Sequence, residues 1–246
     1  MNSFISWVGG KKLLRKQIIE QFPEQYDRYI EVFGGAGWVL FGKEPKGMEV
    51  YNDVNSNLVN LYRCVKYHPE ALQKELEGTL MSRELFFDAI QAARGLTDIQ
   101  RAARFFVAIK ESFGTTLDSF GVRPKNMIKA VEFLSDASER LKNVVVENLD
   151  FEHLIHTYDK ETALFYMDPP YYQAEKYYPD RFQPEDHKRL KEAVDKIKGK
   201  AIISYNDCQE IRDLYKGYRI IETDRANNLS VKDGGSRYRE LIIKNF

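Results

Sequence analysis

Four consecutive residues, Asp168-Pro169-Pro170-Tyr171, follow directly on an apolar run at 164–167. A carboxylate, two prolines and an aromatic ring in this order suit chemistry on the exocyclic amine of a nucleobase. That nitrogen is a poor nucleophile because its lone pair is delocalised into the ring. The Asp168 carboxylate and the Pro169 carbonyl could each accept one of its two N–H bonds. This would favour a pyramidal nitrogen and direct its lone pair at an electrophile.

The prolines and the tyrosine suit a rigid pocket for such a base. Proline has no N–H group and fixes φ near −65°, which keeps the two acceptors in place. Tyr171 offers a flat face on which a base can stack, an interaction of about 1–3 kcal/mol. A base inside a duplex cannot reach such a pocket, so the target nucleotide has to be flipped out. A rigid turn after a strand would explain the prolines, but not the Asp and the Tyr that flank them.

A second candidate site begins at Gly34-Gly35-Ala36-Gly37, which follows a strand predicted at 28–33. In open α/β sheets, ligands bind at the carboxyl ends of the strands, and Asp53, after the next predicted strand, could accept bonds from both ribose hydroxyls of a nucleoside-type cofactor. Leu40 stands where a dinucleotide fingerprint requires its third glycine, which disfavours a nicotinamide or flavin enzyme. A glycine turn followed by a helix-capping Asp explains the same residues, so these features alone leave both interpretations open.

The hydrophobic pattern predicts strands that alternate with helices, which is typical of a doubly wound parallel sheet. The region at 69–141 breaks the alternation, because it has helical periodicity (84–93, 99–111 and 136–141) and no convincing strand. We therefore expect a Rossmann-like sheet built from 1–68 and 142–246, with a helical subdomain inserted at 69–141. The polar stretch 223–236 is expected to be a loop. The predicted strands are 28–33, 48–51, 144–146, 163–167, 200–204, 218–221 and 240–244, and the predicted helices outside the insertion are 12–22, 56–67, 184–197 and 207–215.

Composition narrows the class of protein. The 246 residues carry 37 Lys and Arg against 37 Asp and Glu, so the chain is no histone-like polycation, although three local runs (1–16, 101–129 and 225–244) are basic. Two cysteines exclude a disulfide framework and a four-cysteine metal site. His153 and His156 lack further ligands at metal-binding spacing, so we expect no metal. The absence of a long apolar segment and of a signal-peptide core predicts an intracellular protein with no membrane association.

These motifs resemble, in order and over nearly the whole chain, the Dam-type (alpha-group) DNA adenine-N6 methyltransferases, which use S-adenosylmethionine (SAM). The segment Ser6-Trp7-Val8-Gly9-Gly10-Lys11 is similar to their amino-terminal cofactor motif, and Asn52-Asp53-Val54-Asn55 to their N-D-I-N element. Glu31-Val32-Phe33-x-Gly35-x-Gly37 is similar to their glycine motif, with Val32 where the family usually has proline. Asp168–Tyr171 matches their catalytic motif.

The resemblance implies an enzyme that transfers the methyl group of SAM to a flipped-out adenine in double-stranded DNA. It implies a SAM-methyltransferase sheet with the insertion as a target-recognition subdomain, a cytoplasmic, nucleoid-associated location, and a restriction endonuclease, if one is involved, as a separate chain. The expected site residues fall into three groups: catalytic Asp168, Pro169, Pro170 and Tyr171; SAM-binding Trp7, Lys11, Phe33, Gly35, Gly37, Asp53 and Asp168; and DNA-binding Lys110, Arg123 and Lys125.

Other interpretations differ in substrate or class. A methyltransferase acting on cytosine N4 usually has S-P-P-Y, and one acting on RNA or a protein amide N-P-P-Y, so Asp168 favours adenine. A DNA-binding regulator without catalysis would have no need of intact Trp7, Lys11, Asp53 and Asp168. The family's most frequent target is GATC, but the stretch at 109–116 lacks its recognition asparagines and arginine, which predicts a different or relaxed site. His187, at a predicted helix start, is expected at the surface.

Overall fold

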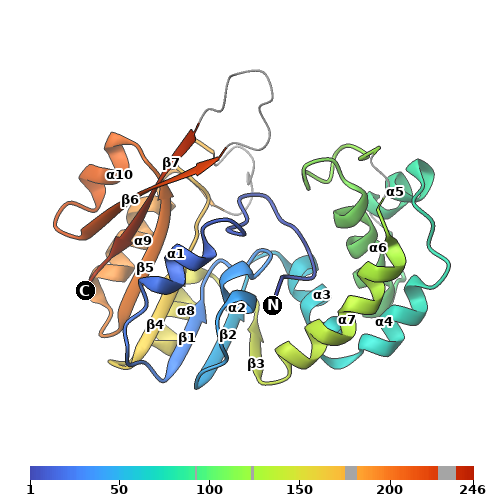
Figure 1. Cartoon of the computed structure of the whole chain (residues 1–246), viewed down its shortest axis with the longest axis horizontal. Helices are drawn as coiled ribbons and strands as arrows, with labels where there is room; N and C mark the ends of the chain where they lie inside the picture. Colours follow the sequence, from blue (N-terminus) through green and yellow to red (C-terminus); the bar gives the residue numbers. More distant parts are fainter. Residues whose placement is uncertain (92, 123–124, 175–181, 227–236) are drawn as a thin grey trace.

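The computed structural model describes residues 1–91, 93–122, 125–174, 182–226 and 237–246. Its centre is a seven-stranded sheet in the order β3-β2-β1-β4-β5-β7-β6 (Figure 1). Strands β1 to β5 pair in parallel, and β7 runs antiparallel to both neighbours, β5 and β6. The strands are β1 (Arg28–Glu31), β2 (Met48–Asn52), β3 (Val144–Glu147), β4 (Ala163–Met167), β5 (Lys200–Asn206), β6 (Arg219–Ala226) and β7 (Arg237–Lys244). The predicted α/β class is confirmed.

Helices cover both faces of this sheet, so the central strands β1 and β4 are buried on both faces. Tyr29, Tyr51 and Tyr166 face one side, where the helices of the first third of the chain pack. Ile30 and Phe165 face the other side, against helices from the second half. The first set is α1 (Arg15–Glu20), α2 (Trp38–Gly42) and α3 (Ser56–Tyr67); the second is α8 (Phe151–Tyr158), α9 (Asp186–Lys196) and α10 (Gln209–Leu214).

Between β2 and β3 the chain leaves the sheet and forms a block of helices beside the β3 edge (Figure 1). This block consists of α4 (Pro69–Leu76), α5 (Arg83–Ile90), α6 (Asp98–Glu111) and α7 (Met127–Leu141). It packs on α3, and its last helix is tied to the sheet by Arg140, which donates to the Glu49 carboxylate of β2 at 2.6 Å. A buried ion pair therefore fixes the last helix of the block to the sheet.

Several elements differ from the prediction. The last helix of the block begins at Met127 rather than near 136, because the Asn126 side chain accepts from the Lys129 amide and caps it there. Helix α2 has five residues, too few to show a period, and the pattern of α8 was not recognised. Strand β6 continues to Ala226, so the expected loop begins later than 223; its remainder, 227–236, lies outside the described residues. Within the described ranges, no helix has the length and apolar character of a membrane span.

Candidate active site

The parallel strands end at one edge of the sheet and carry the polar residues of both predicted motifs there. The glycine turn follows β1, Asp53 follows β2, and Asp168 follows β4. In the next parallel strand, Asn206 is the last residue. The sheet order places these strand ends side by side, so residues far apart in sequence share one edge.

The glycine turn after β1 is closely packed and needs its glycines. Gly35 and Gly37 have φ of 50° and 64°, which L side chains rarely adopt, and a Cβ atom on Gly34 would lie 2.3 Å from the Tyr51 ring. The hydroxyl groups of Tyr51 and Tyr62 donate to the Gly35 carbonyl at 2.7 and 3.2 Å. These two hydrogen bonds fix the backbone of the glycine turn at the edge of the sheet.

Asp53 closes the turn from the neighbouring strand. Its Oδ2 atom accepts from the Gly35 amide at 2.9 Å and its Oδ1 atom from the Asn55 amide at 2.8 Å. Asp53 therefore holds the glycine turn, and it is half-buried at the edge where a ligand would bind. Each carboxylate oxygen can accept more than one hydrogen bond, so the two roles are compatible. The simpler sequence interpretation, in which Asp53 caps the next helix, is wrong, because Asn55 is the N-cap of α3.

Glu31, at the end of β1, holds the far side of the same turn. Helix α2 begins after Gly37, which has no side chain to cap it, and Glu31 Oε2 instead accepts from the Leu40 amide at 2.8 Å. The same oxygen accepts from the Tyr29 hydroxyl at 2.7 Å. Burial raises the pKa of Glu31 to about 8, an effect that its hydrogen bonds and Lys43 only partly offset.

The amino-terminal segment lies against both motifs. The Trp7 indole would be 3.1 Å from a Cβ on Gly35, so it covers the glycine turn, and its ring centroid lies 5.8 Å from that of Phe105 in α6. Four residues later, Lys11 is almost fully buried. Its Nζ atom lies 2.7 Å from Asp168 Oδ1 and 2.8 Å from the Gly9 carbonyl oxygen. The segment thus brings its tryptophan to one motif and its lysine to the other.

A third charged residue joins Lys11 and Asp168. Glu240, in β7, places Oε2 3.9 Å from Lys11 Nζ and accepts a hydrogen bond from the Tyr171 hydroxyl. Lys11 Nζ also lies 4.6 Å from the centroid of the Tyr171 ring. Burial raises the pKa of the Tyr171 hydroxyl well above its usual range, and the carboxylates of Asp168 and Glu240 raise it further. The phenol is therefore a neutral donor.

The backbone after Tyr171 is anchored by β5. Asn206 Oδ1 accepts from the Tyr172 amide at 3.0 Å, and its amide group donates to the Tyr172 carbonyl at 3.3 Å. Sequence reasoning gave neither Asn206 nor Glu240 a role, although the stretches 204–207 and 239–245 that contain them resemble elements of the Dam-type methyltransferases. The available signal was a Glu that directly precedes the apolar run Leu241-Ile242-Ile243, where a charged residue requires a partner.

Phe33 and His187 belong to one group of packed aromatic rings. The Phe33 ring packs on Phe151 and Phe182, with centroids 5.6 and 5.8 Å apart. The prediction that His187 lies at the surface is wrong: it is 3% exposed, and its Nδ1 atom is 2.7 Å from the Tyr205 hydroxyl. His187 lies on the buried face of α9 with Leu190 and Val194, whereas its neighbour Lys188 is exposed.

The predicted DNA-binding residues lie at the end of α6 and in the segment after it. Lys125 Nζ donates to the carbonyl oxygens of Lys110 and Ser112, so it holds the segment's backbone. Burial, together with the nearby charge of Lys125, lowers the pKa of Lys110 to about 8. Arg123 lies outside the described residues. Lys110 and Lys125 are thus brought together at the end of α6.

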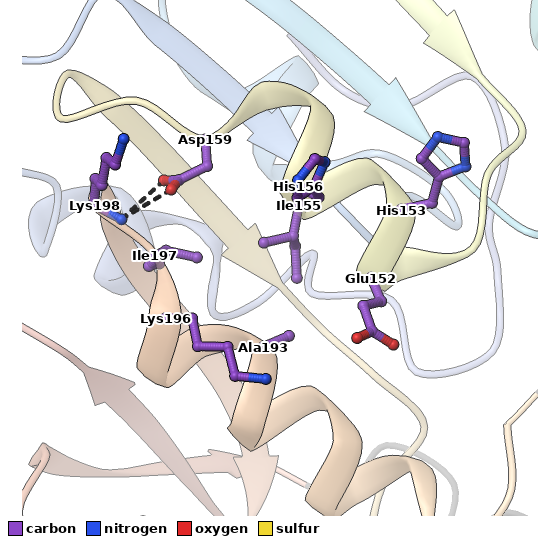
Figure 2. Close-up of a pocket in the computed structure, with 9 residues that line it drawn as sticks. All are labelled: Glu152, His153, Ile155, His156, Asp159, Ala193, Lys196, Ile197 and Lys198. Carbon is purple, nitrogen blue, oxygen red and sulfur yellow. Dashed lines mark hydrogen bonds between the residues drawn. The ribbon is translucent and has the colours of Figure 1, made fainter.

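A separate cavity of about 490 Å³ lies between α8 and the end of α9 (Figure 2). Asp159, in its wall, accepts from the backbone amides of Lys198 and Gly199 at 3.0 Å, just before β5 begins. It therefore lies toward the amino ends of the strands, at the edge opposite to Asp168. Among the described residues, no three His, Cys, Asp or Glu side chains are grouped as a metal site. The lining residues are Glu152, His153, Ile155, His156, Asp159, Ala193, Lys196, Ile197 and Lys198.

Comparison with known proteins identifies the class of protein as a methyltransferase. Residues 7–229 match the model of the D12 class N6 adenine-specific DNA methyltransferases, and the chain belongs to that family. It is 28% identical to the Type II methyltransferase M1.LlaDCHI of Lactococcus lactis subsp. cremoris, over 100% of this chain and 96% of the relative. It is 24% identical to the Type II methyltransferase M.CviBI of Paramecium bursaria Chlorella virus NC1A, over 100% of both. A DNA adenine methylase of Haemophilus influenzae is 22% identical, over 87% of this chain and 82% of the relative.

Proposed function

We propose that this methyltransferase transfers the methyl group of SAM to N6 of an adenine flipped out of double-stranded DNA, at a specific short site. The observation that carries the proposal is the shared edge: the glycine turn with Asp53 and the tetrapeptide with Lys11 end neighbouring parallel strands. A donor held at the first group and a base held at the second would meet there.

The residues of the glycine turn fit a nucleoside-type donor. The Trp7 ring packs directly against Gly35 at the strand end, and the half-buried Asp53 carboxylate beside them suits ribose hydroxyls. We therefore assign SAM binding to Trp7, Phe33, Gly35, Gly37 and Asp53, with Lys11 and Asp168 at the reacting end. SAM supplies an activated methyl group on a sulfonium, so the chain has to position the acceptor rather than activate the donor.

The tetrapeptide would orient the acceptor amine. The Asp168 carboxylate and the Pro169 carbonyl accept its two N–H bonds, and Asp168 takes up the proton that the nitrogen releases on methylation. Pro170 keeps the segment rigid, and Tyr171 stacks on the base. Because Lys11 lies over one face of the Tyr171 ring, the base would use the other. Positioning of this kind can supply roughly 7–11 kcal/mol of the barrier.

The setting of the reaction is a further part of the proposal. The helical block α4–α7 would be the target-recognition subdomain, with Lys110, Arg123 and Lys125 near the DNA backbone. Two relatives are named Type II methyltransferases, so we propose that any restriction endonuclease partner is a separate chain. The substrate would place the enzyme in the cytoplasm with the nucleoid.

The direct test incubates the purified protein with labelled SAM and mixed-sequence duplex DNA. We expect label in DNA as N6-methyladenine, and none in RNA or protein. Label in RNA, in protein or in cytosine would contradict the proposal.

A further inference from the structure

We propose that Glu240 is a positioning residue of the active site, which fixes the Tyr171 ring through its hydroxyl group and holds Lys11 beside Asp168. The inference rests on the proposed function, in which Tyr171 stacks on the target base. Glu240 is 1% exposed and lies in β7, directly opposite Asn206 of β5 in the sheet register. A buried carboxylate in an apolar strand is costly unless it is paired, so the contacts of Glu240 with Tyr171 and Lys11 indicate its role.

The first partner is Tyr171. Its hydroxyl donates to Glu240 Oε2, which fixes the free end of a side chain whose other end is fixed by the tetrapeptide backbone. A hydrogen bond to an ionised acceptor is roughly twice as strong as one between neutral groups, so the ring plane is strongly defined. With Lys11 Nζ 4.6 Å from the ring centroid on one face, only one orientation presents the other face to a base.

The second partner is Lys11. Its ammonium lies 2.7 Å from Asp168 Oδ1 and 3.9 Å from Glu240 Oε2, and its side chain is 3% exposed. The Lys11 ammonium is held between two carboxylates. Without Glu240, Asp168 would have to hold Lys11 and accept the amine of the base at the same time. From strand β7, Glu240 therefore acts on the stacking ring directly and on the Asp168 carboxylate through Lys11.

The test is a double-mutant cycle of Tyr171→Phe and Glu240→Gln. The first substitution keeps the aromatic ring and removes the hydroxyl. The second keeps an oxygen acceptor of the same size and removes the charge. Single-turnover methylation of a duplex substrate at saturating SAM and DNA is measured for wild type, both single variants and the double variant. Glu222→Gln is the matched control, because Glu222 lies on the adjacent strand β6 and contacts Arg212 at the surface.

We expect Tyr171→Phe to slow methylation about tenfold with Glu240 present, and about threefold or less in the Glu240→Gln background, because the bond to a neutral amide is weaker. Glu240→Gln alone should slow methylation severalfold, and Glu222→Gln should leave it unchanged. With 2-aminopurine at the target position, bound Glu240→Gln should be brighter than bound wild type, because a less fixed ring stacks on the base less completely. Thermal melting verifies that each variant is folded.

Equal effects of Tyr171→Phe in the two backgrounds would overturn the inference, as would a Glu240→Gln variant with the wild-type rate and the wild-type fluorescence. Either result, with an active wild type, leaves the proposed function intact. A wild-type protein that methylates no DNA adenine would overturn the proposed function and this inference with it.

Discussion

The carboxyl edge of the sheet and the segment between α6 and α7 are built in different ways. At the edge, Lys11, Asp53 and Tyr171 are each held by contacts from neighbouring elements. In the segment after α6, Thr115 and Leu117 have φ of 62°, and Phe113 and Val122 are 64% and 73% exposed. The first region is fixed by buried charge and sheet geometry, and the second by a few backbone contacts.

This difference follows from what each region is proposed to do. Methyl transfer requires acceptors fixed to a fraction of an ångström, which strand ends provide better than loops. Sequence recognition is delivered by side chains on an exposed segment, which can change without loss of the fold. Substitutions at the edge should therefore alter the chemistry or the stability of the sheet, whereas substitutions near Lys110 should alter DNA binding alone.

The largest effect is expected at Asp168. Asp168→Ala removes an acceptor for the amine and the carboxylate that lies 2.7 Å from the buried Lys11 ammonium, so methylation should fall at least a hundredfold, equivalent to about 2.7 kcal/mol. Asp168→Asn keeps an acceptor but not the charge, and should retain more activity. Single-turnover rates for the two variants measure this, and a rate for Asp168→Ala within tenfold of wild type would remove Asp168 from the reaction.

The second effect concerns stability at the same edge. The folded-state pKa of Glu31 is raised from 4.5 to about 8, so the protonated carboxyl group favours folding; this contribution is complete below pH 4.5 and is lost as pH rises toward 8. Glu31→Gln is neutral throughout and keeps an acceptor for the Leu40 amide. The Tm of Glu31→Gln relative to wild type should therefore rise between pH 5 and pH 8. A constant Tm difference over that range would show that Glu31 is ionised throughout.

Asp53 should affect cofactor binding more than the chemical step. Asp53→Ala removes the proposed ribose acceptor, which is remote from the reacting methyl group, and should raise the KM for SAM about tenfold or more with a smaller change in kcat. Asp53→Asn removes the negative charge but keeps an acceptor for the Gly35 amide. It therefore shows whether the effect of Asp53→Ala comes from the lost charge or from a disrupted glycine turn. A fall in kcat with an unchanged KM would contradict the assignment.

The smallest effect is expected in the segment after α6. Since the pKa of Lys110 is lowered to about 8, its ammonium is present below pH 8 and lost above it, so DNA affinity should decrease a fewfold between pH 7 and pH 9. Lys110→Arg stays charged and should flatten this dependence. If Lys110 binds a phosphate, Lys110→Ala should also reduce the salt slope of DNA binding by roughly 0.9. An unchanged slope would place the DNA elsewhere.

The sequence predicted the sheet well because its strands are short apolar runs separated by helical periods. The strand at 163–167 and the helix at 56–67 have the predicted bounds. Helix α2 was missed because its start depends on Glu31, nine residues before the Leu40 amide that it caps. The tetrapeptide could be found from its local residue types. Glu240 could not, because it accepts a hydrogen bond from the hydroxyl of Tyr171, which lies 69 residues away in the sequence. Only the antiparallel β7 brings them together.

The measurement that tests the central claim most directly is base mapping of methylated DNA. Plasmid is isolated from methylation-deficient cells that express the protein or its Asp168→Ala variant. One sample is digested to nucleosides to identify the modified base, and a second, intact sample is sequenced to map the modified positions. We predict N6-methyladenine within one short duplex site, not restricted to GATC, and none with the variant. Methylation of cytosine N4, unmodified adenines, or equal methylation by the variant would contradict the account.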